Sequence, residues 1–294
     1  MPKINNFRSV SAIESKKKKK NTNWIGLLPL IIFSFGFQII PILSLINSSL
    51  STKKGYSFEN YRRAFSPYIK EAFLNSTKLS LTTAFLGVIC GFLIAYAIFS
   101  TEKKFFKNAL IALADVTTNF GGAPLAFAFI VTLGSTGVVT LILKKMGISL
   151  YPNFRIYSIS GLTIAYLYFQ IPLMIMLILP SLQGLKKEWW EASINLGANS
   201  GQFWLHIGLP ILSPSLLSSF FILFANSFGA YATAWTLTGP DVNLVTVQIA
   251  SLIRGEVQLE IGLADALAVI SLIIILLCVA GYLTLSTKAK RFRI

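Results

Sequence analysis

Few side chains of this chain have the chemistry of catalysis. Its 294 residues include one histidine, His206, and two cysteines, Cys90 and Cys278, both inside apolar runs. One histidine cannot build a multi-histidine metal site, and two thiols in apolar runs do not indicate a disulfide framework. The sequence has no G-x-x-x-x-G-K-[ST] motif to cradle nucleotide phosphates and no plausible Ser/His/Asp set. We expect no catalytic residue, no metal site and no cofactor bound directly by the chain.

Polar side chains inside apolar runs offer a different chemistry. They are costly in a bilayer and usually face the bundle interior or a water path. Hydrogen bonding between packed helices is at least as good an explanation for most of them. Tyr166 and Tyr231 have the weakest claims, because tyrosine is common at membrane interfaces, and two acidic residues near a path would suit a cationic cargo. The candidate pathway residues are Asp115, Asn119, Gln170, Asn226, Tyr231 and Asp265.

The composition predicts helices in a membrane around these residues. The chain is 54% apolar and only 13% charged, with a mean hydropathy of +0.67. Soluble domains average roughly 45–50% apolar and 25% charged residues. A spanning helix needs about 20 mostly apolar residues. We expect an all-α, polytopic membrane protein whose six transmembrane helices cover residues 24–46, 79–99, 109–133, 157–182, 211–237 and 264–285.

Two of these runs contain helix-breaking or small residues. Gly121-Gly122-Ala123-Pro124 interrupts the third run, and it fits equally well a broken helix at a transport site or a kink relieved by neighbouring helices. Asn226 precedes a small-residue stretch, residues 227–233, that would allow close helix contact and a hinge. A weaker run, residues 138–143, is too short to span.

The basic residues predict the orientation. The formal charge is +15, from 26 Lys and Arg against 11 Asp and Glu. With a cytoplasmic N-terminus, 16 basic residues fall inside and nine outside, in keeping with the positive-inside rule. The five lysines at 16–20 would attract anionic lipid, at about 1 kcal/mol each, rather than nucleic acid. We expect a basic cytoplasmic tail (1–23), a transmembrane domain (24–285) and a second basic cytoplasmic tail (286–294) in a cell-membrane protein.

The connection at 183–210 is the longest cytoplasmic one. Leu185, Trp189, Ser193 and Leu196 recur at helical spacing, and Gly197 can end that helix in a left-handed cap. Next, either of two adjacent residues, Asn199 or Ser200, can cap a second short helix at 201–206. An interfacial helix with its tryptophans among the lipid headgroups is one interpretation. The other is a docking knob for a cytoplasmic partner.

The offsets in this loop favour docking. Glu191-Ala192-Ser193, Gly197-Ala198, Ile207 and Leu209-Pro210 resemble the EAA loop of binding-protein-dependent ABC importer permeases. That pattern is E-A-A, three residues, G, nine residues, I, then L-P; Ser193 replaces its second alanine. The resemblance implies a type I importer subunit with the MetI-like permease fold, whose loop inserts as a coupling helix into an ATP-binding subunit. It assigns docking to Trp190, Glu191, Ala192, Ser193, Gly197, Ala198, Leu209 and Pro210.

The resemblance also implies partners and a cargo. ATP would be hydrolysed by a dimer of cytoplasmic ATP-binding subunits, and an extracellular or periplasmic binding protein would deliver the cargo. A second permease would complete the pathway, a different chain rather than a copy. The segment 226–239 is similar to polyamine (spermidine/putrescine) permeases, although iron, thiamine and phosphonate importers share such sequences. The alternatives are an ion-gradient-driven secondary transporter, for which no convincing internal repeat is seen, and last a membrane-embedded enzyme.

The orientation is testable by cysteine labelling. Cysteines placed at Lys18 and Asn195 should react with a membrane-impermeant thiol reagent only after the membrane is opened, because both positions are expected in the cytoplasm. Labelling of either cysteine in intact cells would contradict the cytoplasmic placement of the N-terminus and the loop.

Overall fold

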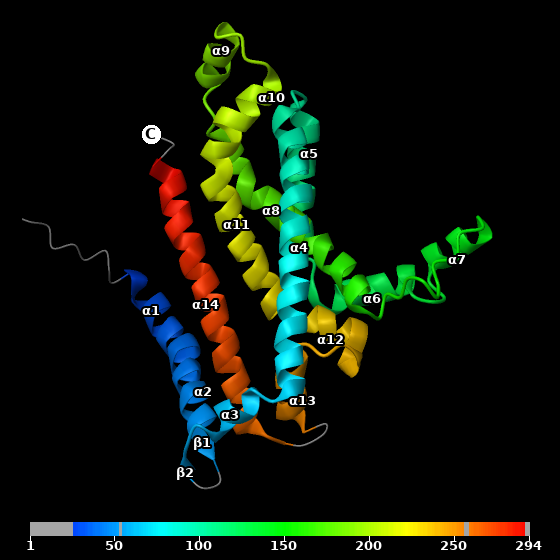
Figure 1. Cartoon of the computed structure of the whole chain (residues 1–294), viewed down its shortest axis with the longest axis vertical. Coiled ribbons are helices and arrows are strands. Elements are labelled where there is room, and N and C mark those ends of the chain that lie inside the picture. The colour runs from blue at the N-terminus through cyan, green and yellow to red at the C-terminus, as the bar shows by residue number, and fades with distance from the viewer. Residues whose placement is uncertain (1–25, 53–54, 256–258, 292–294) are drawn as a thin grey trace, which may run out of the picture. The chain divides into compact units, whose positions relative to one another are not determined.

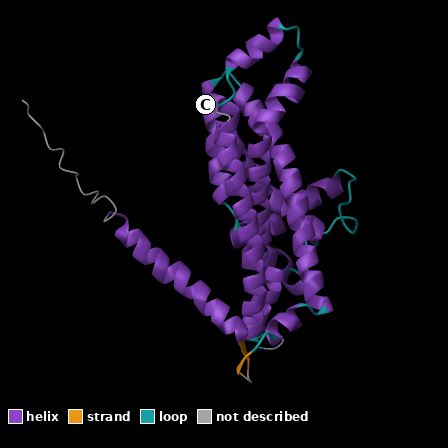
Figure 2. Cartoon of the chain, turned by 60° about the vertical axis from the view of Figure 1, so that its left-hand side comes forward, coloured by secondary structure: helices purple, strands orange, loops and turns teal. Residues whose placement is uncertain are grey.

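The computed structural model describes residues 26–52, 55–255 and 259–291, with side chains up to residue 287. Nearly all of the described chain is helical (Figure 2). It divides into two compact units, residues 1–44 and 45–294. The first contains α1 (Leu28–Ser34), the π-helical turn η2 (Phe35–Ile39) and the start of α2 (Ile40–Leu50).

Proline explains the π-helical turn of the first unit. Pro41 has no N–H, and its ring would clash with the carbonyl four residues earlier in a regular helix. The turn ends two residues before Pro41, where the Ile40 N–H donates to the Phe35 carbonyl, five residues back. The wider turn lets one continuous helical run pass the proline. The first predicted run is therefore helical from Leu28, while its beginning at Trp24 lies outside the described residues.

The second unit contains the remaining elements. A two-stranded antiparallel hairpin pairs Ser51 with Tyr56 and Thr52 with Gly55. The strands are β1 (Ser51–Thr52) and β2 (Gly55–Tyr56). The helices are α3 (Glu59–Ala64), α4 (Pro67–Ser100), α5 (Lys104–Asn119), α6 (Gly122–Leu133), α7 (Val138–Lys145), α8 (Ile159–Gln183), α9 (Lys187–Asn195), α10 (Ser200–Phe203), η3 (Trp204–Gly208), α11 (Leu209–Gly229), α12 (Ala232–Thr238), η4 (Gly239–Asp241), α13 (Val245–Arg254) and α14 (Ile261–Arg291).

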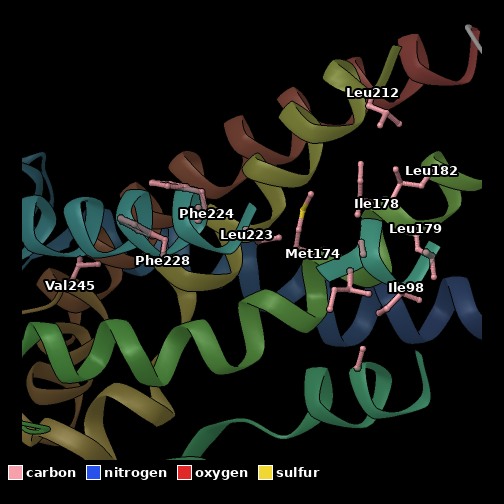
Figure 3. Packing of buried hydrophobic residues seen from close by; sticks show 14 of the residues in the cluster. Ile98, Met174, Ile178, Leu179, Leu182, Leu212, Leu223, Phe224, Phe228 and Val245 are labelled. Carbon is pink, nitrogen blue, oxygen red and sulfur yellow. The ribbon is translucent and has the colours of Figure 1, made fainter. Parts of the chain in front are cut away.

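Long helices enclose the core of this unit. α4 packs along α8 and α11, and α11 packs along α14 (Figure 1). Two glycines of α4 allow the closest approach, since a Cβ on Gly91 would lie 2.5 Å from the Cβ of Met174, and one on Gly87 would lie 3.2 Å from the Cβ of Gln170. Small residues let membrane helices gain dispersion contacts at short range. The buried side chains between these helices include Ile98, Met174, Ile178, Leu182, Leu212 and Leu223 (Figure 3).

A second apolar cluster holds the shorter helices. Leu125 of α6, Leu162 and Tyr166 of α8, and Leu237 of α12 are at most 2% exposed and belong to this cluster. α6 packs mainly along α12, whereas α5 packs along α8. The two halves of the third predicted run therefore pack against different partners.

The predicted fold class and the number of spans are confirmed, but several extents are wrong. The second span begins at Pro67 and not at Leu79, the third takes in residues 138–143, and two predicted runs are broken. In the described chain, six segments are long and apolar enough to cross a membrane: Leu28–Leu50, Pro67–Ser100, Gly122–Lys145, Ile159–Gln183, Ser200–Gly229 and Ile261–Thr287. The run 109–133 is two helices, because Gly121 is extended and Gly122 has φ +71°, which ends the helix before them. The run 211–237 is also divided into two helices, because α11 ends at Gly229 and Ala230 is extended.

Candidate functional site

The first helix of the loop at 183–210 is α9 (Lys187–Asn195), and its end has the predicted geometry. Gly197 has φ +80°, a left-handed conformation that glycine adopts without a Cβ penalty. Its N–H donates to the Ile194 carbonyl, and the Ala198 N–H donates to the Ser193 carbonyl. These two bonds form a Schellman motif, which satisfies carbonyls that the helix end would leave unpaired. Gly197 thus fixes where α9 stops.

The second helix of the loop begins as predicted but does not end at His206. The Asn199 side chain accepts from the Gln202 N–H, and the Gln202 side chain accepts from the Asn199 N–H, each at 2.9 Å. This capping box starts α10 and settles which of the two predicted caps is used. The helix continues through η3 into α11, so the predicted end at His206 is wrong. As at Pro41, a π-helical turn ends two residues before Pro210 and lets the helix continue past the proline.

The predicted docking residues differ in exposure. Glu191, Ala192, Gly197, Leu209 and Pro210 are exposed, and Trp190 and Ala198 are half-buried. Ser193 is only 5% exposed, and its hydroxyl donates to the Trp190 carbonyl at 2.7 Å. It therefore supports α9 from within. The Glu191 carboxylate lies 3.1 Å from the Lys187 ammonium, one helical turn earlier, in a solvent-exposed pair.

An apolar hollow of about 410 Å³ lies between α9 and the helix that follows it. Its walls come from both arms of the loop, so the turn at Gly197 shapes it. The lining residues are Trp189, Ala192, Ser193, Leu196, Ala198, Gln202, Phe203, His206, Ile207 and Ile211. The loop therefore offers a partner an exposed carboxylate beside an apolar recess.

The breaks in the third and fifth predicted runs meet each other. The Gly122 N–H donates to Thr233 Oγ1 at 3.0 Å, and the Thr233 hydroxyl donates back to the Gly122 carbonyl at 3.4 Å. The buried Tyr166 hydroxyl donates to the Ala230 carbonyl at 2.7 Å. A Cβ on Gly122 would lie 3.6 Å from that of Ala232, so the two chains are in close contact. We call this meeting of α5, α6, α11 and α12 the break junction.

The candidate pathway residues separate into exposed and packed ones. Asp115 and Asn119 are exposed on α5, and Asn226 is exposed on α11. Gln170 is fully buried, and its side-chain amide donates to the Leu223 carbonyl at 2.7 Å. The Asn226 amide nitrogen lies 3.5 Å from the Gln170 side-chain oxygen. Gln170 thus joins α8 to α11 and lies beside Asn226.

Tyr231 lies at the break junction, and Asp265 does not. Tyr231 stacks on Trp235, with ring centroids 6.0 Å apart, and the Arg254 guanidinium lies over both rings, at 5.8 and 5.0 Å. Asp265 is half-buried near the start of α14, which packs along α11, α13 and α3. Arg254 is one of the nine basic residues expected outside the membrane, and no further role is predicted for it from the sequence. Tyr231 and Trp235 are four residues apart, so they share one helix face that a cation can cover.

The comparisons with known proteins agree with the resemblance of the loop. No protein-family model matches the chain. The spermidine/putrescine permease protein PotB of Haemophilus influenzae is 25% identical over 224 residues, covering 73% of this chain and 78% of PotB. The probable sulfate permease protein cysT of Prototheca wickerhamii is 29% identical, and the alignment covers 72% of this chain and 80% of cysT. The ferric permease protein FbpB of Actinobacillus pleuropneumoniae is 27% identical and covers 90% of this chain but 40% of FbpB. A thiamine permease also matches.

Solved structures share the fold. A bacterial ABC transporter involved in alginate import aligns with a TM-score of 0.69 at 18% identity, covering 92% of this chain and 95% of the other. A bacterial alginate ABC transporter in complex with an alginate pentasaccharide-bound periplasmic protein aligns with a TM-score of 0.66 at 19% identity. The chain therefore has the fold of ABC importer permeases, and its sequence is similar to permease proteins of polyamine, sulfate, ferric and thiamine transport systems.

The break junction predicts a measurable loss on substitution of Thr233. Thr233→Val keeps the shape but leaves the Gly122 N–H without its acceptor, which should lower the free energy of unfolding by about 1–3 kcal/mol. Unfolding of the purified protein in detergent measures this. Thr132→Val is the matched control, because the exposed Thr132 hydroxyl bonds only within its own helix. Equal stability of the two variants would contradict a structural role for the Thr233–Gly122 pair.

Proposed function

We propose that this chain forms half of the translocation pathway of an ATP-driven importer and couples that pathway to ATP hydrolysis through residues 191–210. One observation carries the proposal. The second arm of the loop is continuous with α11, and α11 ends at Gly229, beside the break junction. A displacement of the loop by a partner would therefore reach the junction through one continuous helical segment, Ser200–Gly229, which includes the π-helical turn.

The loop supplies the contacts that docking requires. The exposed carboxylate of Glu191 would pair with a basic group of the ATP-binding subunit in place of Lys187. The small residues Ala192 and Gly197 permit close approach, and the apolar hollow accepts an apolar side chain of that subunit. ATP would be bound and hydrolysed by a dimer of such subunits, so that this chain itself binds no cofactor. Both termini would lie in the cytoplasm, with the basic tails near anionic lipid.

Exposed polar groups support a second permease. Asp115 and Asn119 on α5 and Asn226 on α11 are exposed within apolar runs. The asparagine amides have partners within the chain, but a carboxylate facing lipid is costly, so Asp115 requires a neighbouring chain or a water path. We propose a related but different permease, as the similarity to polyamine systems suggests. The complex of the alginate transporter with a periplasmic protein supports an external binding protein as a further partner.

The break junction limits the choice of cargo. The relatives are named for polyamine, sulfate, ferric and thiamine transport. Asp115 is an exposed carboxylate on the helix that enters the junction, and it favours a cationic cargo such as a polyamine. Ferric iron and thiamine are alternative cargoes, since both are cations as polyamines are. An anionic cargo, phosphonate or sulfate, would instead be met by Arg254 on the aromatic pair.

The coupling role predicts loss of the partner when the loop is changed. Glu191→Lys reverses the docking charge, and Gly197→Val forces a branched residue into a left-handed conformation. Each should reduce co-purification of the ATP-binding subunit about tenfold or more, with loss of ATP-dependent uptake. Glu102→Lys, the same charge reversal in the connection between α4 and α5, should change neither. Wild-type co-purification and uptake in both loop variants would refute docking through this loop.

The cargo assignment predicts a charge effect on transport. Radiolabelled spermidine should accumulate with ATP, and Asp115→Asn should raise its apparent KM about tenfold, as expected for loss of one charge contact. Asp115→Glu should restore most of the affinity. Sulfate, ferric iron and thiamine serve as competitors. Competition by sulfate together with no effect of Asp115→Asn would point to an anionic cargo instead.

A further inference from the structure

Four aromatic side chains connect the docking helix to α4. Trp190 of α9 contacts Phe203 edge-on, with ring centroids 4.8 Å apart. Phe203 contacts Trp204 at 5.8 Å, and Trp204 contacts Tyr96 of α4 at 5.0 Å, again edge-on. Phe92, one helical turn before Tyr96, lies 6.4 Å from Trp204. Such edge-to-face contacts have preferred geometries, so each ring constrains the next. We call Trp190, Phe203, Trp204 and Tyr96 the aromatic chain.

The aromatic chain contacts α4, a helix to which the loop is not covalently joined. The loop is joined covalently to α8 before it and to α11 after it. No described helix packs its backbone extensively along α9. α4 has no covalent link to the loop, yet it packs along α8 and α11 and forms much of the core. The side chains of the aromatic chain therefore give α9 a connection to α4 beside the packing of α4 along α8 and α11.

The π-helical turn places Trp204 in this route. The Leu209 N–H donates to the Trp204 carbonyl, five residues back, which widens the helix ahead of Pro210. The indole lies against the backbone of Gly208, where a Cβ would come within 2.6 Å of a ring carbon. The ring also packs against the core. Gly208 and the wide turn thus hold the indole between the loop and α4.

We propose that Trp204 is a positioning residue that makes α4 move together with the docking loop. This inference rests on the proposed function. α11 follows the loop through its own backbone, whereas α4 has no covalent link to the loop and meets it at the Trp204 ring, in addition to packing along α8 and α11. Removing the ring should therefore separate the two movements, and removing a ring from elsewhere on the same end of the protein should not.

The test uses the importer purified with its ATP-binding subunit in nanodiscs, with Cys90 and Cys278 replaced by serine. A bimane label is attached through Lys78→Cys on α4 or, separately, through Leu217→Cys on α11; both positions are exposed. The change in fluorescence on trapping with ATP and vanadate is measured. Trp204→Leu should reduce the α4 response about fivefold or more and retain the α11 response. Trp204→Phe should keep part of the α4 response.

Two further variants separate positioning from stability. Gly208→Ala keeps the indole but displaces it, so it should reproduce the loss of the α4 fluorescence response. When it is combined with Trp204→Phe, the α4 response should fall no further than in Trp204→Phe alone, because the smaller ring leaves room for the added methyl group. Phe203→Leu should weaken the α4 response, whereas Phe105→Leu, on an 81% exposed ring of α5, should not.

The outcomes distinguish this inference from the function it rests on. Equal loss at α4 and α11 in Trp204→Leu would overturn it, since that is the result of a general structural defect. An unchanged α4 response in Trp204→Leu and Gly208→Ala would also overturn it, while coupling through the loop would stand. No response at either label in the wild-type complex would refute the proposed coupling and this inference with it.

Discussion

The need to pair every backbone N–H and C=O inside an apolar phase governs this structure. A helix that ends within a membrane leaves such groups without water, and each costs several kcal/mol if unpaired. In this chain two helices end beside each other in apolar runs, at Asn119 and Gly229. It meets the cost by joining the two breaks, with Thr233 pairing the Gly122 backbone and Tyr166 pairing the Ala230 carbonyl. The two breaks therefore cannot be rearranged independently.

The same constraint explains which residue types surround the break junction. Close approach of two broken helices needs small side chains, and the chain has Gly122 opposite Ala232. It needs a donor from a third helix, and Tyr166 is 1% exposed with its hydroxyl directed to the break. One turn later, Gln170 donates an additional bond to the Leu223 carbonyl in the interior of α11. Polar residues of α8 thus hold α11 and the break after it in place, and exposed polar residues are left on α5 and α11.

Local features could be predicted from the sequence, and tertiary ones could not. The cap at Gly197 and the start at Asn199 depend on a few adjacent residues, so the sequence predicted the first and narrowed the second to Asn199 or Ser200. Hydropathy predicted six spans but merged α5 with α6 and α11 with α12, because it registers apolarity and not the partner of each backbone group. Gln170 and Asp115 look alike as polar residues in apolar runs; only packing shows that one is buried and the other exposed. The position of Arg254 over Tyr231 and Trp235 depends equally on packing.

The hydrogen bonds along Ser200–Gly229 and at its two ends determine which parts of this segment are rigid and which can deform. The segment Ser200–Gly229 is 30 residues long, about 45 Å at the helical rise. Its loop end is fixed by a capping box, and its far end adjoins a pair of bonds of 3.0 and 3.4 Å between Thr233 and Gly122. A regular helix transmits displacement without breaking its own bonds, so strain introduced at the loop concentrates where bonds are fewest. Those places are the π-helical turn before Pro210 and the break junction. Because Trp204 lies in the first and Thr233 in the second, the residues that govern coupling are expected at these two positions rather than along the helix between them.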